Sequence, residues 1–142
     1  MNSATFRDVT LLLGRIGIGV IFIAHGWQKF FDLGISGTQA MFTDMSVPLA
    51  DIAAIIAATF ELVGGVALLI GFAARIAGVL LFLVMLGAFW FVHVGNGIFV
   101  VDGGYELVLA LGAGSLMIAG VGAGRFSVDA FAGKNSRILS PS

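Results

Sequence analysis

The fold is decided by residues 52–73, IAAIIAATFELVGGVALLIGFA, and by residues 76–101, IAGVLLFLVMLGAFWFVHVGNGIFVV. The first stretch contains one charged residue, Glu61, and the second contains none. A helix rises about 1.5 Å per residue, so about 20 apolar residues cross the hydrocarbon core of a bilayer. Each stretch is therefore long enough to form a membrane-spanning helix.

Two further apolar stretches extend this pattern to both sides. Residues 107–124 carry no charge. Residues 9–31 are mainly Leu, Ile, Val, Phe and Gly, interrupted by Arg15, His25, Gln28 and Lys29. We predict an all-α integral membrane four-helix bundle that forms a single domain over residues 1–142. The expected helices lie near residues 10–31, 48–72, 74–94 and 104–123, followed by a polar tail at residues 124–142.

The composition excludes several classes of protein. Apolar residues make up 59% of the chain and charged residues 11%, against about 25% in soluble domains, so a water-soluble monomer is excluded. Lys and Arg number 7, Asp and Glu number 8, and no basic run is present, which excludes a nucleic-acid partner. Cysteine is absent, so thiol chemistry and disulfides are excluded, and redox chemistry requires a bound cofactor or a partner.

The positive charges predict the orientation in the membrane. They lie before the first expected helix, between the second and third, and in the tail, at Arg7, Arg75, Arg125, Lys134 and Arg137. The other two connections contain acidic residues and no Lys or Arg. By the positive-inside rule, both termini are expected in the cytoplasm. The sequence thus predicts a multi-pass protein of the bacterial inner membrane.

Ionisable residues within or at the ends of the expected spans are the candidates for function. A charge at mid-bilayer costs about 2.5–3.5 kcal/mol on insertion scales, so it requires a partner or a role. Seven residues qualify: Arg15, His25, Lys29, Glu61, His93, Asp102 and Glu106.

Depth along the helices sorts these residues into two layers. If Lys29 and Leu49 lie at the outer boundary, Arg15 is about 21 Å and Glu61 about 18 Å below it. We therefore expect a structural ion pair between Arg15 and Glu61. The second layer is an outer polar cluster made of His25, Lys29, His93 and Glu106.

Each candidate also has a purely structural interpretation. The Arg15–Glu61 pair can serve only to fix two helices. The histidines can hydrogen-bond carbonyls, and Lys29 can extend to the surface. Single residues from different helices are a weak metal signal, so we predict no metal site.

The order and spacing of several motifs resemble those of a known family. The matching features are Arg15 with Gly17 and Gly19, His25-Gly26, Lys29, ELVGG at 61–65, Gly71 with Arg75, Asn96-Gly97, GYE at 104–106 and GAGRFSVD at 122–129. Over roughly residues 8–130 the chain resembles the DoxX family of small four-helix bacterial membrane proteins, which are DoxX/DoxD-like. Ala123 departs from the expected proline, at a turn outside any site.

The resemblance implies a connection with quinones and membrane oxidoreductases. DoxX-like proteins resemble the membrane subunit of thiosulfate:quinone oxidoreductase, and for most members no reaction is established. The residues that match the family pattern at candidate sites are Arg15, His25, Lys29, Glu61 and Glu106.

Our leading hypothesis is an inner-membrane protein that binds a quinone-like or other amphipathic small molecule near the outer leaflet and serves a membrane redox system. The expected ligand-binding residues are His25, Lys29, His93, Glu106, Trp27 and Trp90, with Phe22 and Phe89 packing on the ring. No covalent cofactor is expected; a quinone or a lipid is the expected ligand. The expected partners are membrane lipid, an oxidoreductase and a second copy of the chain.

Two alternatives remain open. One is a non-catalytic anchor or partner subunit of an oxidoreductase complex. The other is a small-solute transporter in which Glu61 carries the coupling proton, although no inverted repeat is visible. Enzymatic activity also remains open: the sequence favours no catalysis by the chain alone and is compatible with a subunit of a quinone-linked oxidoreductase.

Overall fold

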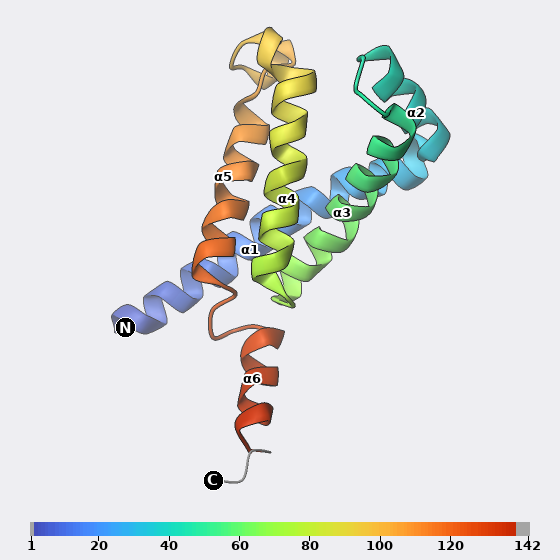
Figure 1. Ribbon diagram of the computed structural model, residues 1–142. Helices are drawn as coiled ribbons and strands as arrows, with labels where there is room; N and C mark the ends of the chain where they lie inside the picture. Colours follow the sequence, from blue (N-terminus) through green and yellow to red (C-terminus); the bar gives the residue numbers. More distant parts are fainter. Residues whose placement is uncertain (1, 139–142) are drawn as a thin grey trace.

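The protein is all-α, as predicted, in a computed structural model that describes the backbone of residues 2–138 and the side chains of residues 2–133 (Figure 1). Its α-helices are α1 (Ser3–Trp27), α2 (Gly34–Asp44), α3 (Ala50–Ile70), α4 (Ala74–Ala88), α5 (Glu106–Val121) and α6 (Val128–Ile138). Two π-helical segments, η1 (Gln28–Asp32) and η2 (Phe89–His93), continue α1 and α4. Two 3₁₀ turns, η3 (Val94–Asn96) and η4 (Val100–Asp102), lead into α5.

Within residues 2–138, three continuous helical stretches are long and apolar enough to cross a membrane: Ser3–Asp32, Ala50–Ile70 and Ala74–Asn96. The fourth apolar helix, α5, is shorter, with 16 residues. All four predicted helices are therefore present. The first begins at Ser3 rather than near residue 10, because the Asn2 side chain accepts a hydrogen bond from the Thr5 amide (2.9 Å) and caps the polar first turn.

The helices form two arms. α1 packs against α3, α2 packs against the same α3, and α4 packs against α5 (Figure 1). α3 also contacts α4, which joins the arms. The N-terminus and α6 lie at one end of the molecule, whereas α2 and the loop before α5 lie at the other (Figure 1).

Glycines set the close approach of α1 to α3. A Cβ on Gly26 would lie 2.5 Å from the backbone nitrogen of Leu62, and one on Gly19 would lie 2.8 Å from the carbonyl oxygen of Gly65. Small residues at such positions allow helix backbones to meet, which gains van der Waals contact inside a membrane. This contact fixes how α1 and α3 are aligned, and so decides which polar side chains meet.

The turn between α3 and α4 is tied to the C-terminal segment. Gly71 ends α3 with φ 71°, a left-handed conformation that glycine adopts without strain. The Asp129 carboxylate accepts hydrogen bonds from the amides of Ala73 (2.7 Å) and Ala74 (3.0 Å) and thereby caps α4. α6 therefore begins at a fixed point under the bundle.

Candidate functional site

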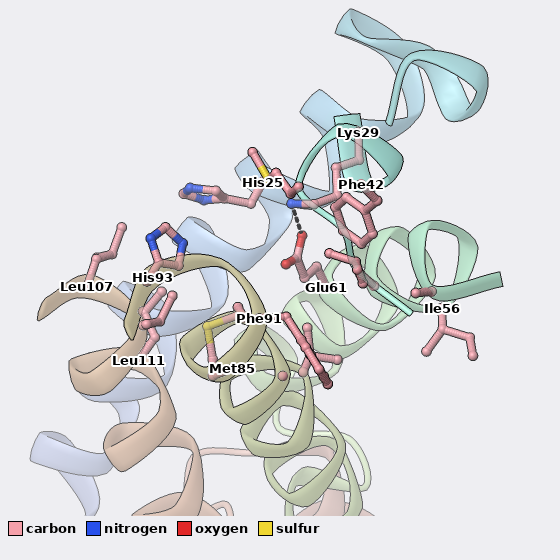
Figure 2. A pocket seen from close by; sticks show the side chains of 18 of the residues that line it. His25, Lys29, Phe42, Ile56, Glu61, Met85, Phe91, His93, Leu107 and Leu111 are labelled. Carbon is pink, nitrogen blue, oxygen red and sulfur yellow. Dashed lines mark hydrogen bonds and ion pairs between the residues drawn. The ribbon is translucent and has the colours of Figure 1, made fainter. Parts of the chain in front are cut away.

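A cavity of about 550 Å³ lies between the α1–α2–α3 arm and the α4–α5 arm (Figure 2). Most of its lining is apolar and includes Phe22, Met41, Phe42, Met45, Ile56, Phe91, Leu107 and Leu111. Four polar side chains also line it: His25, Lys29, Glu61 and His93. Ligand pockets in proteins commonly have this volume and this mixture of many apolar groups with a few polar ones.

Lys29 and Glu61 form a buried ion pair at the cavity (Figure 2). Lys29 Nζ lies 2.7 Å from Glu61 Oε2, and the two side chains are 12% and 5% exposed. The predicted partner of Glu61 was Arg15, and that prediction is wrong. The glycine contacts between α1 and α3 place Lys29, rather than Arg15, opposite Glu61.

Arg15 instead binds backbone carbonyls at the opposite end of α3. Its side chain is fully buried; Nη1 donates to the carbonyls of Leu68 (3.1 Å) and Leu69 (3.5 Å), and Nη2 donates to that of Phe126. The last carbonyl oxygens of a helix have no N–H donor within that helix, so a guanidinium can donate to them. Arg15 thus links α1, the end of α3 and the segment before α6, away from the cavity.

Both π-helical segments contribute side chains to the cavity. η1 contains Lys29, and η2 contains Phe91 and His93. The buried Thr38 hydroxyl bonds to the carbonyl oxygens of Lys29 (3.0 Å) and Gly34 (2.9 Å), which ties α2 to η1. Wide turns of this kind are rare and frequently occur at functional sites.

The two histidines have the same hydrogen-bonding arrangement. Nδ1 of His25 lies 2.9 Å from the carbonyl oxygen of Ile21, and Nδ1 of His93 lies 2.7 Å from that of Gly103. A carbonyl oxygen only accepts, so each Nδ1 carries the hydrogen and donates it. Both imidazole rings line the cavity (Figure 2).

Glu106 does not join this cluster. It is the first residue of α5, and its Oε1 accepts a hydrogen bond from the amide of Val100 at 2.7 Å. It holds the loop between η4 and α5 in place and does not line the cavity. The predicted outer cluster therefore contains His25, Lys29 and His93 without Glu106, and Glu61 takes its place.

The predicted tryptophans also lie outside the cavity lining. Trp27 is 52% and Trp90 is 66% exposed, and the Trp27 ring packs on Phe31 at 4.2 Å between centroids. Phe89 packs edge-on against Tyr105, at 5.1 Å. The aromatic residues that do line the cavity are Phe22, which was expected, and Phe42 and Phe91, which were not.

Among the residues that the structure describes, no group of three or more His, Cys, Asp or Glu side chains is placed to hold a metal ion. Glu106, which the sequence placed in the same cluster as the two histidines, bonds to the Val100 amide instead. The side chains that line the cavity offer hydrogen-bonding groups, an ion pair and apolar surface.

Comparison with known proteins places these features in a family context. The DoxX family model matches residues 10–94, which include most of α1 and all of α2, α3 and α4. An uncharacterized protein of Haemophilus influenzae is 31% identical over 131 residues, which cover 90% of this chain and 94% of that protein. Inner membrane protein YqjF of Escherichia coli is 32% identical over 124 residues, covering 87% and 92% of the two chains.

A third relative carries a functional name. The Bacillus subtilis protein named "Putative oxidoreductase CatD" is 42% identical over 88 residues, or 62% of this chain. The match spans 61% of the length of CatD. No solved structure matches the chain.

Proposed function

Because this chain belongs to the DoxX family and is a multi-pass protein of the inner membrane, we propose that its cavity binds a quinone-like amphipathic molecule for a membrane redox system. The observation that carries the proposal is the buried Lys29–Glu61 pair, 2.7 Å long, at an apolar cavity of about 550 Å³. A quinone has a flat ring with polar oxygens and an apolar tail, and both kinds of surface have a counterpart in this lining.

Lys29 is the group best placed to bind a ligand oxygen. An ammonium group has three N–H donors, and Glu61 accepts one of them. The remaining donors are available to an oxygen of a bound molecule. Glu61 keeps the ammonium oriented and compensates its charge, so that a neutral ligand need not do so.

The apolar lining fits the remainder of such a ligand. Phe42 and Phe91 come from α2 and η2, on the two arms that enclose the cavity, and Met41 and Met45 add flexible side chains. Methionine adapts to irregular apolar shapes, and aromatic rings pack on flat ligands. These walls suit a ring and the beginning of an isoprenoid or alkyl tail.

The proposed redox role rests on the name of the relative CatD and on the absence of cysteine from this chain. CatD is named as an oxidoreductase, and this chain has no cysteine through which it could exchange electrons. Electrons would therefore pass between the bound molecule and a separate oxidoreductase partner. In this proposal the chain presents the ligand and a partner performs the other half-reaction.

Ligand binding is tested with purified protein in a mild detergent. Organic extracts of the protein should contain a quinone by mass spectrometry, and added decylubiquinone should raise the melting temperature. Ala57→Leu places a larger side chain in the cavity and should weaken decylubiquinone binding about tenfold or more, equal to about 1.4 kcal/mol.

The matched control is Ala110→Leu, at an exposed position of α5 outside the cavity lining, which should bind as the wild type does. Absence of an extracted quinone together with absence of any thermal shift would contradict the proposal. If Ala57→Leu loses the ligand yet still co-purifies with an oxidoreductase as the wild type does, the anchor role is the better description.

A further inference from the structure

The two cavity histidines both present a hydrogen-bond acceptor. Each Nδ1 donates its hydrogen to a backbone carbonyl, of Ile21 for His25 and of Gly103 for His93. In a neutral imidazole the other nitrogen, Nε2, then carries a lone pair and no hydrogen. Within the described part of the chain, neither Nε2 has a hydrogen-bond partner.

The carbonyl contacts make this arrangement a fixed property of the fold. Ile21 lies one turn before His25 in α1, so its carbonyl is available wherever the helix is intact. Gly103 precedes α5, and its carbonyl accepts from the His93 ring across the loop. Rotating either ring to present an N–H to the cavity would break a short hydrogen bond of 2.9 or 2.7 Å.

The polar groups of the cavity are therefore mostly acceptors. Besides the two Nε2 atoms, Glu61 offers Oε1, because Lys29 bonds to its Oε2. Four polar side chains of the described residues line the cavity, and among them Lys29 is the one with N–H donors left for a ligand, because each histidine Nδ1 already donates to a backbone carbonyl. All four side chains line the same cavity, and Figure 2 shows the two imidazole rings to one side of the Lys29–Glu61 pair.

The excess of hydrogen-bond acceptors in the cavity distinguishes the two redox forms of a quinone. The oxidised form brings two carbonyl oxygens, which only accept, so a carbonyl facing Nε2 sets one lone pair against another. The reduced hydroquinone brings two hydroxyl groups, each of which donates one hydrogen and still accepts. A polar group without a hydrogen-bond partner in an apolar cavity costs free energy. A hydroxyl group that donates to Nε2 gives a partner to the hydroxyl hydrogen and to the nitrogen lone pair.

We infer that the cavity selects the hydroquinone, a para-dihydroxy aromatic ring, over the oxidised quinone, with His25 and His93 Nε2 accepting its hydroxyl hydrogens. The inference rests on the proposed function and narrows its ligand class. Tighter binding of the reduced form also raises the reduction potential of the bound couple. A tenfold preference corresponds to about 30 mV for this two-electron couple.

The test compares decylubiquinol with decylubiquinone under anaerobic conditions, using wild-type protein and equilibrium dialysis. The quinol should bind at least about tenfold more tightly, a difference of about 1.4 kcal/mol. The dimethyl ether of decylubiquinol, which has no hydroxyl hydrogen, should bind no better than the quinone. In the variants His25→Phe and His93→Phe the preference should fall, whereas Trp27→Phe, outside the cavity lining, should keep it.

The outcomes separate the two proposals. Equal binding of both forms, or tighter binding of the quinone, would overturn the selection inference and leave the quinone-type site standing. Binding of neither form would overturn both. The comparison of ligands on the wild-type protein needs no variant, so poor folding of a histidine variant does not affect the result.

Discussion

Replacing Lys29 with methionine is expected to lower the melting temperature of this protein sharply. The Lys29 ammonium lies 2.7 Å from the Glu61 carboxylate, and both side chains are nearly buried. Removing one member of a buried pair leaves the other charge uncompensated, which costs about 3–5 kcal/mol in soluble proteins. For a chain of 142 residues, about 3 °C is lost per kcal/mol, so we expect a fall of about 10–15 °C.

The same reasoning predicts a non-additive double variant. Glu61→Met should be about as destabilising as Lys29→Met, whereas combining them should restore about half of the loss or more, because no charge remains buried. Circular dichroism during heating in detergent measures all three. The control is Glu106→Gln, which keeps an oxygen for the Val100 amide. If the melting temperature of the double variant falls by the full sum of the two single decreases, the Lys29–Glu61 interaction is refuted.

Three further predictions concern the scaffold. Gly26→Ala should lower the melting temperature by several degrees, because the added Cβ meets the backbone of the neighbouring helix at 2.5 Å, whereas Gly17→Ala, with no atom within 4 Å, should leave it unchanged or raise it. Arg15→Leu should be strongly destabilising in the same heating experiment, because it removes the guanidinium that donates to the carbonyls of Leu69 and Phe126 and one of the two donors to that of Leu68; a melting temperature equal to that of the wild type would contradict this role. A reporter inserted near Thr43 should be accessible from outside the cell and one at the C-terminus from the cytoplasm, and the reverse labelling would contradict the orientation that the positive charges predict.

Hydropathy predicted the helices well because a membrane-spanning helix requires a long run of apolar residues, which hydropathy measures directly. The predicted span at 48–72 corresponds to Ala50–Ile70, and the predicted end of the first helix at residue 31 lies in η1. Gly71 is a signal that sequence analysis can use, since a glycine after an apolar run commonly ends a helix. The early start at Ser3 was missed because the first turn is polar and contributes nothing to an apolar pattern.

The wrong partner for Glu61 has a geometric cause. The depth estimate placed Lys29 level with Leu49, as if both helices ended at one plane. In the structure Lys29 meets Glu61, well inside α3, while the start of α3 packs against α2. The alignment of α1 with α3 depends on the glycines at 19, 26 and 65, which are visible in the sequence. The sequence has many small residues, however, and only the structure shows which of them form the contact.

The π-helical segments were beyond sequence analysis for a different reason. A π turn adds one residue to a turn without changing composition, so nothing in QKFFD or FWFVH distinguishes it from an α-helix. Yet Lys29, Phe91 and His93, which lie in these turns, all line the cavity. Lys29 and His93 could thus be identified as candidates from the sequence, whereas the contribution of Phe91 and the common orientation of the three side chains required the structure.

The contacts of Arg15 also impose an order on the synthesis of the protein. Its acceptor carbonyls lie 53, 54 and 111 residues later in the chain. Until α3 has been made, the arginine in α1 has none of these acceptors, and a charged side chain in the membrane is costly without a partner. Synthesis of α3 supplies two of these acceptors and synthesis of residue 126 supplies the third, so the full set of Arg15 contacts is complete only when almost the whole chain has been translated.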